Sequence, residues 1–98
     1  MSRRGMKAGR TPGAKNQAVA ELAYTAYGEW CDSTGADKVW DEARSLRGDG
    51  LLGEAIGLLE YNAGQWLETK CVMYRGLAKA GRDAFRAEVF EHIAGGLL

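Results

Sequence analysis

The sequence predicts an all-α protein, a compact bundle of four or five helices with a flexible basic N-terminal arm. Three observations support this fold class. Apolar residues recur at steps of three and four over most of the chain, which is the period of an amphipathic helix. Glycine-containing breaks divide the pattern into segments of helical length, and no useful stretch alternates like a strand. A chain of 98 residues holds one core, so we expect an arm over residues 1–13 and one helical domain over residues 14–98.

The arm is defined by its charge. The first twenty residues contain five Lys and Arg and no Asp or Glu, which leaves eight Lys and Arg against all thirteen Asp and Glu elsewhere. An arm of charge +5 therefore precedes a body of charge −5, although the whole chain is neutral. Residues 1–13 contain three glycines, the only proline and no large apolar side chain except methionine, so we expect them to be disordered when free.

A first helix is predicted from about Ala14 to about Asp32, where the cluster Asp32-Ser33-Thr34-Gly35 ends it. Pro12 and Gly13 form a turn before it. Its apolar residues lie on one stripe, and they are Val19, Leu22, Ala23, Ala26, Tyr27 and Trp30.

A second helix follows, with Thr34 as its cap and Asp37 three residues later as in a weak capping box. Gly48-Asp49-Gly50 ends it, and Asp49 is placed to cap the next helix. The residues expected to face inward are Val39, Trp40, Ala43 and Leu46, and those expected to face outward are Asp37, Asp41, Glu42, Arg44 and Arg47.

The third segment, Leu51 to about Ala80, is the longest helical pattern, and we expect one long or kinked helix because no proline interrupts it. The alternative is a division into two helices near Asn62-Ala63-Gly64. Gly53 and Gly57, one turn apart, would let another helix approach closely. The expected inward face consists of Leu52, Ile56, Leu59, Ala63, Trp66, Met73 and Leu77.

A last helix is predicted after Gly81-Arg82-Asp83, with Asp83 as its cap and Gly95-Gly96 as its end. Its apolar residues are Phe85, Val89, Phe90 and Ile93. Leu97 and Leu98 then form an apolar tail that would dock on a partner. The candidate protein interface is therefore Gly53, Gly57, Leu97 and Leu98, and we expect a homo-oligomer.

The chain offers little for catalysis, so we expect no enzyme, no cofactor and no metal. His92 is the only histidine and is expected to be solvated near a helix end. Cys31 and Cys71 lie forty residues apart without a CxxC spacing, which favours two reduced thiols, although a disulfide stays open. The aromatic residues are expected in the core, with Tyr24 exposed. We find no signal peptide and no bilayer span, so we expect a soluble protein in the host cytoplasm or the virion.

One segment, Gly9-Arg10-Thr11-Pro12-Gly13-Ala14-Lys15-Asn16-Gln17, resembles the Gly-Arg-Pro-x-Gly-Ser/Ala-x-Asn-Lys segment of phage-encoded small proteins, including small terminase subunits and related packaging proteins. It is also distantly similar to an AT-hook. Thr11 and Gln17 depart from the pattern, and its proline is displaced to Pro12. The resemblance implies a phage protein whose arm contacts DNA. The candidate nucleic-acid-binding residues are Arg3, Arg4, Lys7, Arg10, Lys15 and Asn16.

These features favour a non-enzymatic phage-type accessory protein whose arm engages nucleic acid in DNA packaging or handling. An alternative is a small protein-binding inhibitor or adaptor, such as a phage antagonist of a host defence complex, because the acidic body would suit a basic partner surface. A virion structural protein whose arm ties neighbouring subunits together is a third hypothesis.

Overall fold

The computed structural model describes residues 12–98 of the chain, and the all-α prediction is confirmed there. Four long helices and one short helix follow one another without a strand among the described residues. The elements are α1 (Pro12–Cys31), α2 (Ala36–Gly48), α3 (Leu52–Lys70), α4 (Val72–Arg75) and α5 (Lys79–Leu97).

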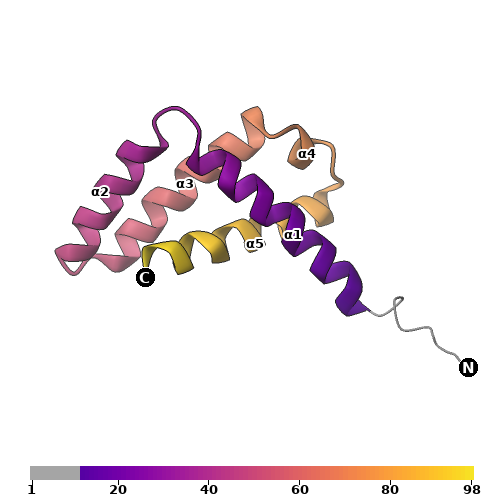
Figure 1. The fold of residues 1–98 in the computed structure, drawn as a ribbon, viewed down its shortest axis with the longest axis horizontal. Helices are drawn as coiled ribbons and strands as arrows, with labels where there is room; N and C mark the ends of the chain where they lie inside the picture. The colour runs from indigo at the N-terminus through magenta and orange to yellow at the C-terminus, as the bar shows by residue number, and fades with distance from the viewer. Residues whose placement is uncertain (1–11) are drawn as a thin grey trace, which may run out of the picture.

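The helices pack as two pairs. A short connection joins α2 and α3, which lie side by side and run in opposite directions, while α1 crosses α5 and so joins two helices far apart in the sequence (Figure 1). Helix α5 also packs against α3 and thereby holds the two pairs together. The result is an elongated molecule with extents of 56 × 27 × 21 Å. The start of α1 and α4 lie toward one end of its long axis, and α2 and the C-terminus lie toward the other (Figure 1).

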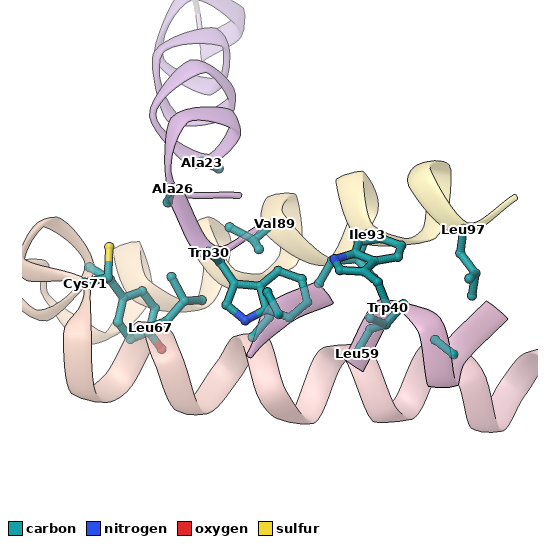
Figure 2. Close-up of a cluster of buried hydrophobic side chains, with 14 of the residues drawn as sticks. Ala23, Ala26, Trp30, Trp40, Leu59, Leu67, Cys71, Val89, Ile93 and Leu97 are labelled. Carbon is teal, nitrogen blue, oxygen red and sulfur yellow. The ribbon is translucent and has the colours of Figure 1, made fainter. Parts of the chain in front are cut away.

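The core runs along the length of α3. Leu59 and Leu67 of α3 face Val89 and Ile93 of α5, and Trp30 lies between these helices (Figure 2). No side chain of the polar or charged residue types is buried among the described residues. The buried residues are Ala23, Ala26, Trp30, Ala36, Trp40, Ala43, Ala55, Leu59, Ala63, Leu67, Cys71, Tyr74, Phe85, Val89, Ile93 and Leu97.

Helix α1 agrees with its predicted stripe. Ala23, Ala26 and Trp30 are buried at steps of three and four residues, and the helix ends at Cys31, one residue before the predicted end. It begins at Pro12, two residues earlier than predicted, because proline is well tolerated in the first turn of a helix. Leu22, which the predicted stripe also contains, remains 45% exposed.

Both predicted side-chain caps in the α1–α3 region are wrong. Neither Thr34 nor Asp49 is an N-cap residue, because the N-cap positions of α2 and α3 are Gly35 and Leu51, and neither of these makes a side-chain cap bond; Asp49 is instead the C-cap residue of α2. The tight turns depend instead on backbone conformation. Gly35 (φ 89°) and Gly50 (φ 83°) adopt left-handed conformations that residues with a Cβ rarely adopt.

The prediction of one helix over Leu51–Ala80 is also wrong, and so is the alternative break near Asn62. Helix α3 ends at Lys70, and Cys71 is extended with φ −88° and ψ 101°. Cys71 is buried, and the turn that follows brings Tyr74 into the core, where its ring lies 5.9 Å from that of Phe85. This packing breaks the helix where the sequence has neither glycine nor proline.

The break also moves the last helix. Helix α5 begins at Lys79, with Ala78 at the N-cap position, so the predicted boundary at Gly81-Arg82-Asp83 and the predicted Asp83 cap are wrong. Asp83 instead accepts ion pairs from Lys79 and Arg86.

The inward face of α3 is shifted relative to the prediction. Ala55 and Leu67 are buried there in place of Leu52, which is 37% exposed, and Trp66, which is half-buried. The buried residues Ala55, Leu59, Ala63 and Leu67 step by four rather than by alternating fours and threes.

At the other end, α5 continues through Gly95 and Gly96 to Leu97. Gly96 lies directly beneath two aromatic side chains, because a Cβ at this position would lie 2.6 Å from the hydroxyl oxygen of Tyr27 and 3.2 Å from the Trp40 ring. Leu97 is fully buried, which corrects the expectation of an exposed Leu97-Leu98 tail. Of these two leucines, only Leu98 is exposed.

Candidate functional site

The residues predicted to bind nucleic acid lie at the beginning of the chain. Arg3, Arg4, Lys7 and Arg10 lie outside the described residues, whereas Lys15 and Asn16 belong to the first turns of α1. The structure therefore does not test the predicted contact of these residues with nucleic acid.

The predicted protein interface does not come together as one surface. Gly53 and Gly57 are exposed on α3, and beyond the neighbouring backbone of α3 itself no described atom lies within 4 Å of the position where a Cβ would stand. No other helix of the described residues approaches them closely, so a close helix contact there stays a prediction about a second molecule. Leu97 is in the core, while Leu98 is 77% exposed at the C-terminus.

The described residues reveal a second basic region that sequence analysis missed, which we call the basic corner. Residues 70–86 contain five Lys and Arg and a single acidic residue, Asp83. The segment from the end of α3 to the first turns of α5 carries all five, and they are Lys70, Arg75, Lys79, Arg82 and Arg86. The local excess of Lys and Arg over Asp and Glu can be seen in the sequence, but a single net charge of −5 for the whole body conceals it.

Two members of the basic corner make ion pairs. The guanidinium of Arg86 lies 3.0 Å from Asp83 and 3.5 Å from Glu68, and it also donates a hydrogen bond to the Tyr74 hydroxyl. The ammonium of Lys79 lies 3.2 Å from Asp83. Arg86 thus ties α3, α4 and α5 together and has a structural role.

The other three members, Lys70, Arg75 and Arg82, form no ion pair within the described part of the chain. Lys70 and Arg75 are exposed, and Arg82 is half-buried in the first turn of α5. That turn contains no acidic residue, and its N-cap residue, Ala78, makes no side-chain bond to the free N–H groups. The positive end of the α5 dipole therefore adds to the charge of these side chains.

A second feature is a cavity of about 540 Å³, lined by residues from the C-terminal halves of α1 and α5 and from α2, which we call the acidic cavity. Three carboxylates and one guanidinium line it together with aromatic side chains. The lining residues are Tyr27, Cys31, Asp32, Asp37, Trp40, Asp41, Arg44 and Gly96.

Arg44 occupies one side of the acidic cavity. Its guanidinium lies 5.5 Å from the centre of the Trp40 ring and 3.3 Å from the Asp41 carboxylate. Asp32 and Asp37 have no ion-pair partner within residues 18–98. The lining therefore keeps an excess of negative charge that no cation of the described chain neutralises.

Two side chains that line the acidic cavity, those of Tyr27 and Cys31, have perturbed pKa values. Burial raises the pKa of the Tyr27 hydroxyl to about 12, and the neighbouring Cys31 contributes to this shift. Burial also raises the pKa of the Cys31 thiol, and the nearby charges of Asp32 and Asp37 add to this effect, while hydrogen bonding to Tyr27 and Trp40 opposes it. Both groups therefore keep their protons at neutral pH, which does not suit a nucleophile.

Cys31 and Cys71 are both free thiols, as the spacing favoured, and Cys71 is buried. No group of His, Cys, Asp and Glu side chains in the described region has an arrangement that would hold a metal ion.

His92 differs from its prediction, because it is half-buried against α1 rather than solvated. Its ring lies 5.1 Å from Tyr24 and 5.6 Å from Tyr27, measured between ring centres. The Nε2 atom is buried without a hydrogen-bond partner. Tyr24 is 61% exposed, as predicted, and covers the outside of this cluster.

The charges of the body are unequally distributed. Up to Thr69 it contains ten acidic and three basic residues, whereas from Lys70 onward it contains three acidic and five basic residues. None of the helices in residues 12–98 is long and apolar enough to cross a membrane.

Comparison with protein-family models, with curated proteins and with solved structures finds no match for this chain.

Proposed function

We propose that this protein is a non-enzymatic accessory protein that binds duplex nucleic acid through its basic arm and its basic corner. The observation that carries the proposal is the position of Lys70, Arg75 and Arg82, three cations without ion-pair partners among the described residues. Arg75 belongs to α4 and Arg82 to the first turn of α5, and α4 lies toward the same end of the long axis as the start of α1 (Figure 1). Phosphates are the natural ligands of such a cluster, because each contact releases condensed counterions.

The similarity of residues 9–17 to the arms of phage-encoded packaging proteins supports a role in phage DNA packaging or handling. A protein with this role would act in the host cytoplasm or in the virion. The acidic first part of the body, from Glu21 to Glu68, would face away from the duplex because like charges repel.

The salt dependence of the affinity shows how many phosphates the protein contacts. The arm alone, if it neutralises about four phosphates, predicts a slope of log affinity against log salt of about −3.6. Two further contacts from the basic corner would raise the magnitude of this slope to about 5.4. Each lost contact lowers the magnitude by about 0.9.

The test measures affinity for duplex DNA across a salt series by fluorescence anisotropy. The full chain is compared with a chain lacking residues 1–11, which leaves α1 intact, and with Lys70→Gln and Arg75→Gln. Lys38→Gln is the matched control, because Lys38 is exposed on α2 and makes no ion pair within the described residues.

We expect weaker binding and a shallower slope for the deletion and for both basic-corner variants, with Lys38→Gln close to the unchanged chain. Equal losses in Lys38→Gln and Lys70→Gln would remove the basic corner from the site. No measurable binding of DNA by the full chain at low salt would refute the proposal.

A further inference from the structure

Two adjacent cavities, of about 360 and about 220 Å³, are lined by residues of the α1–α2 connection and of the second half of α3, and we call them together the tryptophan groove. They share Ser33, Thr34 and Trp66 in their linings. The residues that line the larger cavity are Asp32, Ser33, Thr34, Trp66 and Lys70. Its volume lies within the range of about 300–1,000 Å³ that is usual for small-molecule sites.

Trp66 is the aromatic residue of the larger cavity. Its side chain is half-buried, because it packs against the core and also lines both cavities. Lys70 lies four residues later on α3, so the indole and the ammonium share one face of the helix. An indole that the core holds in place, and that still borders open space, is a preformed surface on which a planar ring can stack.

The two charged residues of the larger cavity have opposite signs and do not neutralise each other. Neither Asp32 nor Lys70 makes an ion pair within the described residues, although both line this cavity. Asp32 therefore offers a hydrogen-bond acceptor and Lys70 offers a cation, with Trp66 in the same lining. The groove thus lies where the acidic first part of the body, which ends at Glu68, meets the basic corner, which begins at Lys70.

A nucleotide carries the groups that match this lining. Its base stacks on aromatic side chains, its phosphate is attracted by a cation, and the uncharged edge of its base donates hydrogen bonds to a carboxylate. Guanine suits Asp32 best, because its N1–H and N2–H donors lie side by side and can pair with both oxygens of one carboxylate. A base inside a duplex is stacked and paired, so only an unpaired base can enter the groove.

We infer that the tryptophan groove binds an unpaired guanine beside the duplex that contacts the basic corner. This inference rests on the proposed binding of duplex nucleic acid and adds to it the recognition of a place where pairing is interrupted. Lys70 belongs to both surfaces, which places the groove at the edge of the basic corner. The protein would therefore prefer a duplex with unpaired guanines to a fully paired one.

The test measures affinity by fluorescence anisotropy for three labelled DNA duplexes with the same paired sequence. One is fully paired, one has a central bulge of two guanines, and one has a central bulge of two thymines, a base with a single donor on that edge. The site variants are Trp66→Leu and Asp32→Asn. Their matched controls are Tyr61→Leu and Glu54→Gln, which remove an aromatic ring and a negative charge from exposed positions of α3 that line neither cavity.

We expect the unaltered chain to bind the guanine bulge about tenfold more tightly than the paired duplex, as the stacking of one base predicts. Trp66→Leu should abolish this preference, and Asp32→Asn should make the guanine and thymine bulges equal. Both variants should bind the paired duplex as the unaltered chain does, and both controls should keep the preference for the guanine bulge.

A second measurement requires no folded Trp66→Leu variant. Titration of the unaltered chain with the guanine-bulge duplex should shift the indole N–H resonance of Trp66, assigned with Trp66→Phe, but not that of Trp40, which lines neither cavity. An unshifted Trp66 resonance at saturation would overturn the inference. So would equal affinity of the unaltered chain for the guanine bulge and the paired duplex, although duplex binding itself would then stand. Equal affinity for the two bulges would also overturn it, whereas binding of none of the three duplexes would refute the proposed function itself.

Discussion

Replacing Gly96 by alanine tests the close packing of the end of α5 against the side chains of Tyr27 and Trp40. The new Cβ would lie 2.6 Å from the Tyr27 hydroxyl and 3.2 Å from the Trp40 ring. Atoms in favourable contact are about 3.5–4.0 Å apart, so the methyl group would be roughly 0.9 Å too close to Tyr27 and roughly 0.3 Å too close to Trp40. Tyr27 cannot move away freely, because its ring packs against Trp40 and His92.

Gly95 supplies the matched control. It precedes Gly96 in the same last turn, and no atom lies within 4 Å of its Cβ position. Both substitutions gain the same helix propensity, at most about 1 kcal/mol, so the difference between them isolates the overpacking cost of about 1–3 kcal/mol. For a domain of this size, Gly96→Ala should melt about 4–8 °C below Gly95→Ala for each kcal/mol of that cost.

Urea unfolding followed by circular dichroism gives the free energy of unfolding of both variants. The double variant Gly96→Ala with Tyr27→Phe should recover part of the loss, because it removes the oxygen at 2.6 Å. The reasoning is refuted if Gly96→Ala is as stable as Gly95→Ala, or if Tyr27→Phe gives no coupling.

Three further perturbations address other parts of the structure. The pKa of Tyr27 is raised from 10.0 to about 12, so the folded state holds this proton more tightly than the unfolded state does. The contribution of this group to the free energy of unfolding should be fully present below about pH 10 and should be lost as the pH rises toward 12. In urea unfolding measured across this pH range, Tyr27→Phe should show a smaller decrease. His92→Phe removes the buried unpartnered Nε2, and it should raise the free energy of unfolding by about 1 kcal/mol; a clear decrease would contradict this. Arg86→Met leaves the buried Tyr74 hydroxyl without its donor, and it should cost about 1–3 kcal/mol, whereas Lys79→Met breaks only an exposed pair and should cost at most about 0.5 kcal/mol; equal costs in thermal melts would disprove the structural role of Arg86.

The amphipathic pattern was sufficient to predict those helices whose buried residues all belong to the apolar stripe seen in their own sequence. In α1 and α2 the predicted residues Ala26, Trp30, Trp40 and Ala43 are buried, as the local apolar stripe of each helix indicates. The end of α2 at Gly48 was also predictable, since Gly50 is needed for the left-handed turn that follows.

The break at Cys71 was not predictable from local sequence. Lys70-Cys71-Val72 contains no residue that disfavours a helix strongly, and the break arises because Tyr74 must reach Phe85 eleven residues later. The predicted caps failed for a related reason. Thr34, Asp49 and Asp83 are good capping residues, but tertiary packing moved the helix starts away from each of them.

The candidate sites depended even more on long-range contacts. The acidic cavity joins Tyr27 to Gly96, and the aromatic cluster joins Tyr24 to His92, so no local pattern contains either. The basic corner was visible in the sequence as a local excess of Lys and Arg, but the turn at Cys71, which divides these residues among α3, α4 and α5, was not predicted.

The crossing of α1 over α5 has a consequence for the order of events during synthesis. The ribosome produces α1 first, yet the helix that covers Ala23, Ala26 and Trp30 is completed only when residues 79–97 have emerged. The α2–α3 pair is closed by a short connection and can form earlier, because a short loop costs little closure entropy. Nascent chains that stop before α5 therefore expose an apolar stripe on α1, which is the type of surface that chaperones bind and proteases clear.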